Sequence, residues 1–176
     1  MLGYEFTVCV SDETEPPPST ELSPGENLRI ITAAKGQAIA RANPDCVIIA
    51  ADTVVVLDGE YYGKPKDEND AARMLKTLSA RTHEVYTGAA VFNAKSGFLQ
   101  FDYVSTPVTF RELTEDEVLN YIATGEPMDK AGAYGIQGCG AELIAQVDGD
   151  FYNVMGLPVG IVRSMLFNLQ CFLRSK

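Results

Sequence analysis

The chain has 176 residues, of which 46% are hydrophobic and 22% are charged. These proportions exclude a disordered chain, and the length suits about one domain, so we expect a single domain over residues 1–176. The formal net charge of −10 repels nucleic-acid phosphates, and no nucleic-acid partner is expected. A small phosphorylated ligand is compatible with this charge, because the charge of a binding site is local.

Neither a membrane segment nor a signal peptide is predicted. The longest apolar run, Cys46–Ala51, is far shorter than the roughly 20 residues of a membrane helix. The first residues, Met1–Glu5, lack the basic and apolar regions of a signal peptide. The cysteine spacing fits neither a zinc site nor a redox pair, so we expect buried free thiols in a reducing cytoplasm. The cysteines are Cys9, Cys46, Cys139 and Cys171.

The N-terminal part of the sequence predicts a strand, a loop and a helix. Residues Phe6–Val10 are expected to form the strand, and the proline-rich segment Thr14–Gly25 is expected to form the loop. The helix begins after Ser23, which can serve as its N-cap, while Glu26 completes a capping box. Pro24 suits the first helical position.

One lysine of this helix has an unusual position. At about 100° per residue, Lys35 falls inside the apolar stripe of the helix and not opposite it. A lysine there either extends its amine to the rim of the surface, which is the more frequent case, or points it into a cleft. The stripe consists of Leu28, Ile31, Ala38 and Ile39.

The middle of the chain predicts a buried strand, a hairpin and a second helix. The apolar run that ends at Asp52 is typical of a strand covered on both faces, as in a parallel or mixed sheet. Residues Val54–Tyr62 predict a hairpin that turns at Asp58 and Gly59. Apolar residues at helical spacing predict a helix over about Asp70–Leu78.

The C-terminal half predicts two long strands and two helices. The strands are His83–Asn93 and Phe98–Phe110. A third helix opens with the capping box of Thr114 and closes at Gly125, and a last helix starts near Pro158 after a glycine-rich stretch. Because strands and helices mix without strict alternation, the predicted fold class is α/β, with a mixed β-sheet flanked by helices.

Asp52 is the sharpest candidate for catalysis. It follows the predicted buried strand and precedes Thr53, which offers a second oxygen ligand. Open α/β sheets bind ligands at the carboxyl ends of strands, where a carboxylate can hold Mg²⁺ or activate water. The alternative, slightly favoured by spacing alone, is an aspartate that binds nearby backbone N–H groups.

Two further segments carry charged groups. Lys64 lies between a glycine and a proline and could bind phosphate as a point charge, although an ordinary turn lysine is commoner. Glu126, Asp129 and Lys130 begin a polar, glycine-rich loop that continues past Gln137. Such loops often carry function, and the alternative is a charged surface loop whose glycines serve turn geometry.

The remaining candidates are an acidic residue, a histidine and an amide. Glu13 could supply a metal ligand or be an ordinary loop charge. His83, the one histidine, is interpreted as structural and bonded across the sheet, and Asn153 as a structural residue that caps or braces the last helix. Carboxylates, lysines, hydroxyls and amides with almost no histidine suit metal-assisted phosphate chemistry better than acyl transfer.

Five motifs in a fixed order carry a family resemblance that runs from about Met1 to the C-terminus. They are Ala51–Val55 with Gly63–Pro65, His83–Gly88, Thr106–Phe110, Gly125–Gly138 and Asn153–Pro158. In these segments the chain resembles the Maf family of nucleoside triphosphate pyrophosphatases. The resemblance implies an elongated α/β fold similar to that of inosine triphosphatase, with a cleft across a mixed sheet, and usually a homodimer.

The resemblance also implies an activity. Maf proteins hydrolyse a nucleoside triphosphate to the monophosphate and pyrophosphate with Mg²⁺ or Mn²⁺. Members with the Gly-Ile-Gln-Gly sequence found at Gly135–Gly138 prefer dTTP and UTP, and also accept modified pyrimidine nucleotides. A sister branch that acts on 7-methyl-GTP has a glutamate-bearing segment there, so Gln137 favours the pyrimidine branch.

The candidate residues gain roles from the same resemblance. Asp52 matches the family's proton acceptor, and Thr53 and Gln137 match positions tied to base selection. We expect Lys130 to bind substrate as well, and Asp52 to hold the metal together with Glu13. The catalytic set implied by the resemblance is Asp52, Glu13, Lys35 and Lys64.

One departure from the family concerns the N-terminus. Maf proteins begin with a strand and a Ser-Pro-Arg-Arg turn that binds phosphate, and this motif occurs nowhere in the 176 residues. The resemblance therefore implies a chain truncated relative to the family, with an exposed sheet edge and weaker phosphate binding. Two function classes stay open: a nucleotide pyrophosphatase, and a non-catalytic nucleotide-binding or regulatory protein. A structural α/β module is a third, weaker alternative.

Overall fold

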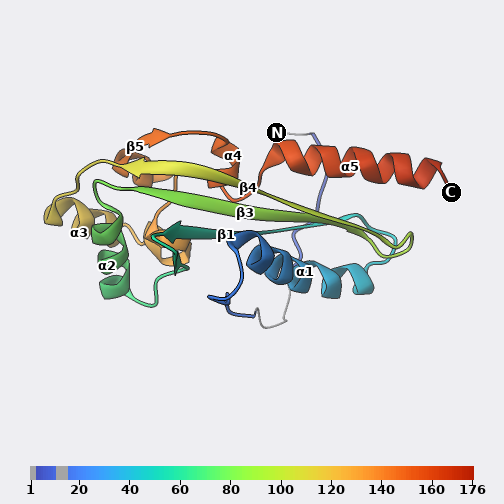
Figure 1. The fold of residues 1–176 in the computed structure, drawn as a ribbon, viewed down its shortest axis with the longest axis horizontal. Helices are drawn as coiled ribbons and strands as arrows, with labels where there is room; N and C mark the ends of the chain where they lie inside the picture. Colours follow the sequence, from blue (N-terminus) through green and yellow to red (C-terminus); the bar gives the residue numbers. More distant parts are fainter. Residues whose placement is uncertain (1–2, 11–15) are drawn as a thin grey trace.

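The computed structural model describes residues 3–10 and 16–176, which fold around one elongated five-stranded sheet (Figure 1). The spatial order of the strands is β2-β1-β3-β4-β5. Helices α1 (Pro24–Ala42) and α5 (Val159–Arg174) lie on opposite sides of this sheet. The predicted α/β fold, with an elongated sheet flanked by helices, is confirmed. The strands are β1 (Ile48–Leu57), β2 (Glu60–Tyr62), β3 (Thr82–Asn93), β4 (Phe98–Phe110) and β5 (Ile144–Val147).

Every strand pairing in the described part of the chain is antiparallel, so the sheet is not the mixed one that the sequence predicted. β3 and β4 pair along almost their whole length, from Thr82 with Thr109 to Asn93 with Phe98. Short turns join β1 to β2 and β3 to β4, and such hairpins require antiparallel neighbours. A continuous apolar run indicates burial, but it does not specify the direction of the neighbouring strand.

β1 runs past Asp52, which lies near the middle of the strand and not at its end. Ile49 is exposed, so the prediction that both faces are covered was wrong. Along β1, Ala50 packs toward α1 and the next residue, Ala51, packs toward α5. Because consecutive side chains of a strand alternate between faces, Asp52 and Thr53 project to opposite sides of the sheet.

The predicted strand Phe6–Val10 does not form. Residues 3–10 contain neither strand nor helix in the described structure. The alternation of apolar residues is present in the sequence, but a strand also needs a neighbouring edge that supplies its hydrogen bonds, and alternation does not specify one. The alternate apolar side chains are all exposed: Tyr4, Phe6, Val8 and Val10.

Helix α1 begins as the sequence predicted. The backbone N–H of Glu26 donates to Ser23 Oγ at 3.4 Å, and the N–H of Ser23 donates to Glu26 Oε2 at 2.9 Å. The helix approaches β3 closely at Gly36, where an added Cβ would lie 2.2 Å from the Phe92 ring. This close approach brings the neighbouring Lys35 to the surface of the sheet.

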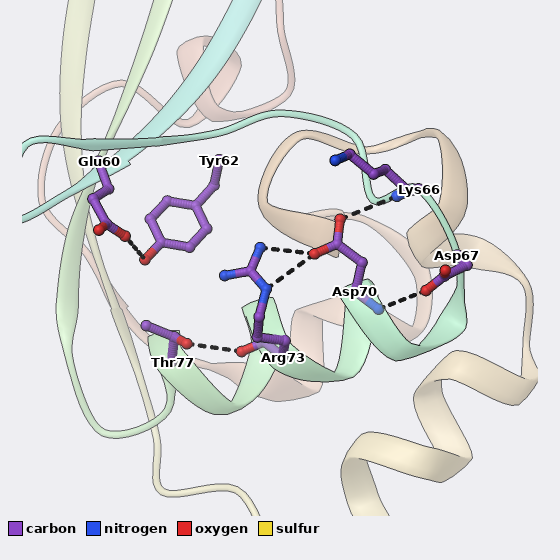
Figure 2. A network of polar contacts seen from close by, with 7 residues as sticks. All are labelled: Glu60, Tyr62, Lys66, Asp67, Asp70, Arg73 and Thr77. Atoms are coloured by element: carbon purple, nitrogen blue, oxygen red, sulfur yellow. Dashed lines mark hydrogen bonds and ion pairs between the residues drawn. The ribbon is translucent and has the colours of Figure 1, made fainter. Parts of the chain in front are cut away.

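Helix α2 (Glu68–Leu78) starts slightly earlier than predicted, because Asp67 caps it. The backbone N–H of Asp70 donates to Asp67 Oδ1 at 2.8 Å, and the Asp70 carboxylate accepts from the N–H of Lys66 at 3.1 Å (Figure 2). These contacts tie the short segment between β2 and α2 to the first turn of the helix. The same segment carries Lys64.

Of the remaining elements, α3 (Glu115–Ala123) lies at one end of the sheet and the helical turn α4 (Phe151–Val154) lies nearer its middle, before α5 (Figure 1). The predicted starts of the third and last helices, next to Thr114 and Pro158, are confirmed. No helix in the residues that the structure describes is long and apolar enough to cross a membrane. The 3₁₀ turns are η1 (Glu126–Asp129), η2 (Ala131–Ala133) and η3 (Gly138–Leu143).

The cysteines are free, as predicted, but they are not buried. All of them are exposed, including Cys46 before β1 and Cys171 in α5. In α5 the buried side chains are Val162, Met165 and Leu169, and Cys171 lies outside this stripe. The prediction of burial was wrong because an apolar sequence context does not say which side of an element faces solvent.

Gly36→Ala tests the close packing of α1 on β3. The new methyl group would overlap the Phe92 ring, so we expect a loss of about 1–3 kcal/mol in the free energy of unfolding despite the higher helix propensity of alanine. Gly160→Ala in α5 is a matched control, because an added Cβ there meets no atom within 4 Å. The control should be at least as stable as the parent. Urea unfolding measures both, and a Gly36→Ala variant of parental stability would contradict the packing argument.

Candidate active site

A cleft of about 860 Å³ opens beside β1. Sites for small ligands typically have volumes of about 300–1,000 Å³. The cleft brings together side chains from α1, β1, the segment after β2 and the region of the 3₁₀ turns. Glu13 lies outside the described residues. The other sequence-predicted site residues all line the cleft: Lys35, Asp52, Thr53, Lys64, Lys130 and Gln137.

Asp52 and Lys35 form an ion pair on the α1 side of the sheet. Their side chains keep exposed fractions of 16% and 25%, so the pair is partly buried but can be reached from the cleft. Of the two positions considered for Lys35, the structure shows the one that points into the cleft. The ammonium orients the carboxylate and places a positive charge beside it.

Thr53 lies on the opposite face of β1. Its Oγ1 is 2.9 Å from Thr87 Oγ1 in β3, and the Thr87 hydroxyl donates to the backbone carbonyl of Asn153 at 2.8 Å. The Asn153 amide is buried and donates to Val85 O at 2.8 Å and to Thr106 Oγ1 at 2.9 Å. Asn153 is therefore structural, as predicted, but it neither caps nor braces the last helix and instead ties α4 to β3 and β4.

Two lysines enter the cleft from neighbouring segments. Lys64 follows β2 and Lys130 lies between η1 and η2. The backbone N–H of Gly132 donates to Gly63 O at 3.0 Å, which joins the two lysine-bearing segments. Lys130 also pairs with Asp129, and its ammonium holds the pKa of that carboxyl below the usual value. This wall of the cleft thus combines two cations with a backbone link that fixes their segments.

The loop that carries Gln137 wraps around the carboxylate of Glu126. The backbone N–H groups of Cys139 and Gly140 each donate to this carboxylate at 3.0 Å, and the Tyr121 hydroxyl donates to it at 2.9 Å. Sequence reasoning placed Glu126 in a polar loop that could carry function, without giving it a role, and missed Tyr121. The one available signal was the position of this tyrosine near the end of a predicted helix, directly before the glycine-rich segment.

The glycines of this loop leave no room for side chains around Glu126. An added Cβ at Gly138 would lie 2.6 Å from Glu126 Oε2, and one at Gly140 would lie 2.2 Å from Gly135 O. The N–H of Gly135 donates to the Tyr121 hydroxyl at 3.1 Å. Burial acts to raise the pKa of Glu126, but the two backbone N–H donors, the Tyr121 hydroxyl and the charge of Lys130 together hold that pKa below the usual value. The loop is therefore built on an ionised carboxylate.

His83 lies in the buried core and is not among the residues that line the cleft. Its Nε2 is 2.7 Å from the Tyr134 hydroxyl, and burial lowers the pKa of the imidazole to about 4. The ring is therefore neutral near pH 7, in agreement with the structural interpretation. The prediction of a partner across the sheet was wrong, because the partner, Tyr134, lies in the segment that follows η2.

Comparison with known proteins places this chain in a family. Residues 1–169 match the Maf family, described as Maf-like protein. This chain belongs to the Maf family. The resemblance inferred from the sequence motifs is therefore confirmed.

Individual relatives of this Maf protein are similar along most of their length. It is 47% identical over 167 residues to the dTTP/UTP pyrophosphatase of Moorella thermoacetica. The aligned residues cover 94% of this chain and 84% of that protein. It is 50% identical over 161 residues to the dTTP/UTP pyrophosphatase of Bacillus pumilus, with 90% and 82% covered. A third relative with the same name, from Aquifex aeolicus, is 44% identical over 162 residues, with 90% and 82% covered.

Glu126→Gln tests the anchor of the Gln137 loop. One carboxylate oxygen becomes an NH₂ group that faces a backbone donor, so we expect a loss of about 1–2 kcal/mol in the free energy of unfolding at pH 7. The pKa of Glu126 is lowered in the folded state, so the ionised carboxylate stabilises the protein above its unfolded pKa, and this contribution is lost as the pH falls through the folded pKa. The difference between parent and variant should therefore shrink in acid.

Urea unfolding at several pH values measures this difference. Glu142→Gln, at an exposed position in η3, is the matched control and should match the parent at every pH. A loss in Glu126→Gln that stays constant from pH 7 to acid would contradict the role given to the charge.

Proposed function

We propose that this Maf protein is a nucleoside triphosphate pyrophosphatase that prefers dTTP and UTP and accepts modified pyrimidine nucleotides. The observation that carries the proposal is the cleft, which gathers a lysine-paired aspartate, two further lysines and a glutamine. The names of the relatives from Moorella thermoacetica and Bacillus pumilus support dTTP and UTP as substrates. A single domain over residues 1–176, a cytoplasmic location and a homodimer stay predictions from the sequence.

The proposed reaction is attack of water on the α-phosphorus. A bond forms between the water oxygen and this phosphorus, the bond to the bridging oxygen breaks, and pyrophosphate leaves with the electron pair. Asp52 accepts the proton of the water, and Lys35 keeps the carboxylate oriented. Lys64 and Lys130 stabilise the negative charge on the phosphates, which the net charge of −10 would otherwise repel.

A divalent metal, Mg²⁺ or Mn²⁺, is part of the proposal. Mg²⁺ in phosphate sites usually binds one or two carboxylates together with phosphate oxygens. The donors of the cleft fit this pattern, because Asp52 offers a carboxylate there. The ion would neutralise the phosphates, with the triphosphate completing its coordination. Glu13, the second ligand predicted from the sequence, lies outside the described residues.

Base selection is assigned to Thr53 and Gln137, which both line the cleft. The Gln137 amide offers a donor and an acceptor, which is enough to bind the edge of a pyrimidine. The Glu126 carboxylate fixes the loop around Gln137 and so defines where this amide stands.

Pyrophosphate release by the purified chain tests the proposal. The substrates are dTTP, UTP, CTP, GTP and 7-methyl-GTP, each with Mg²⁺ and with Mn²⁺. We expect release mainly from dTTP and UTP. A folded sample that releases pyrophosphate from none of them would contradict the enzyme proposal and favour the non-catalytic nucleotide-binding alternative.

Asp52→Asn should abolish hydrolysis while the fold is retained. The amide cannot accept the proton of the attacking water, and general bases typically contribute about 10²–10⁴-fold to a rate. We expect kcat for dTTP to fall by about 10²-fold or more, with thermal unfolding close to the parent. Asp45→Asn, an exposed aspartate paired with Lys95, is the control and should keep the parental rate. An Asp52→Asn variant as active as the parent would remove Asp52 from the mechanism.

Gln137→Glu should weaken the selection for dTTP and UTP. The substitution keeps the length of the side chain but removes its donor and adds a negative charge near a negatively charged ligand. We expect the ratio of kcat/KM for UTP over GTP to fall by about tenfold, the equivalent of one hydrogen bond. An unchanged ranking across the triphosphates would show that Gln137 does not contact the base.

A further inference from the structure

A row of three hydrogen-bonding groups leads from the cleft into the sheet: the Thr53 hydroxyl in β1, the Thr87 hydroxyl in β3 and the backbone carbonyl of Asn153 in α4. Thr53 lines the cleft, and directly opposite it in β3 lies Thr87, which is fully buried. Their Oγ1 atoms are 2.9 Å apart, and the Thr87 hydroxyl donates to the backbone carbonyl of Asn153 at 2.8 Å. The row therefore ends in a group that can only accept a hydrogen bond.

Counting protons along this row fixes the direction of each hydrogen bond. A threonine hydroxyl has one proton, and Thr87 gives its proton to the Asn153 carbonyl. Thr87 can then only accept from Thr53, so the single proton of Thr53 points into the sheet. Toward the cleft, Thr53 Oγ1 is left with lone pairs and acts as an acceptor.

The direction is enforced because both inner groups are buried and held. Asn153 is fully buried, and its side chain donates to Val85 O at 2.8 Å and to Thr106 Oγ1 at 2.9 Å. Thr87 has no access to water, so turning its proton away from Asn153 would leave a buried carbonyl with one bond fewer. The row thus resists reversal when a ligand arrives.

The space beside the Thr53 hydroxyl is kept open by a glycine. An added Cβ at Gly156 would lie 3.3 Å from Thr53 Oγ1, in the range where neighbouring atoms must shift. Gly156 also has a positive φ of 97°, which side chains other than glycine rarely adopt. A ligand group can therefore approach this acceptor from the cleft.

We propose that Thr87 fixes Thr53 as a hydrogen-bond acceptor and thereby selects pyrimidines that carry an imide N–H, such as uracil and thymine, over cytosine. The inference rests on the proposed function and deepens it. Uracil and thymine present N3–H as a donor, whereas N3 of cytosine is an acceptor. The Gln137 amide can turn to offer either its donor or its acceptor, so this side chain alone does not separate the two rings.

Thr87→Val is the decisive variant, because valine has nearly the shape of threonine and suits a strand. Without the partner hydroxyl, Thr53 is free to donate into the cleft. We expect kcat/KM for CTP to rise and the UTP-to-CTP ratio of kcat/KM to fall by about tenfold, the equivalent of one hydrogen bond. Thr87→Ser keeps a hydroxyl at this position and should keep the parental UTP-to-CTP ratio. A merely structural defect would lower both activities and would not raise the one with CTP.

Thr82→Val is the matched control. Thr82 and Thr109 form another hydroxyl pair between β3 and β4, at 2.8 Å, in an exposed position that does not line the cleft. This variant should keep the parental ratio. An unchanged ratio in Thr87→Val, or an equal change in Thr87→Ser, would overturn the inference.

Equilibrium binding separates this inference from the proposed activity. If the parent hydrolyses no triphosphate, calorimetric titration of the same variants with UMP and CMP still measures base selection. Stronger binding of UMP than of CMP by the parent, lost in Thr87→Val and kept in Thr87→Ser, supports the inference even if the proposed hydrolysis fails. Equal binding of UMP and CMP by the parent overturns it.

Discussion

Asp52 lies opposite Gly88 and Thr53 lies opposite Thr87 in the pairing of β1 with β3, and this register decides which groups reach the cleft. It directs the Asp52 carboxylate toward Lys35 in α1 and the Thr53 hydroxyl toward Thr87 in β3. A slip by one residue would exchange the faces and break both contacts together. The Asp52 side and the Thr53 side of the candidate site therefore both depend on the pairing of β1 with β3. Helix α1 packs on one face of this pairing, and the buried Asn153 amide binds the other.

Features that depend on neighbours in sequence could be predicted. The capping box of Ser23 and Glu26 is present, and Leu57 pairs with Glu60 in the predicted hairpin. Features that depend on a distant partner could not. Residues 3–10 have the alternation of a strand but no strand pairing in the described structure, and the apolar run before Asp52 gave no information about the direction of its neighbours.

In the candidate site, too, some features could be predicted from the sequence and others could not. Its charged and amide residues were found from motifs, and six of the seven that were named line one cleft, with Glu13 outside the described residues. The two positions open to Lys35 could be separated only by the packing of α1. The contacts that hold the site could not be predicted, because Thr87 and Asn153 are 66 residues apart, and Tyr121 meets Gly135 across 14 residues. Contacts of this kind leave no periodic trace in a sequence.

The loop around Glu126 is ordered by the protein's own hydrogen bonds, so most of its conformational entropy is lost on folding and not when a nucleotide binds. A ligand then binds to a loop that is already ordered, so less of the binding free energy is lost to ordering the loop than in a flexible one. The same arrangement restricts which substitutions the loop tolerates. Because Gly138 and Gly140 lie against Glu126 and Gly135 with no space for a side chain, any larger residue at either glycine requires a different loop backbone, whereas Gln137 can be exchanged without one.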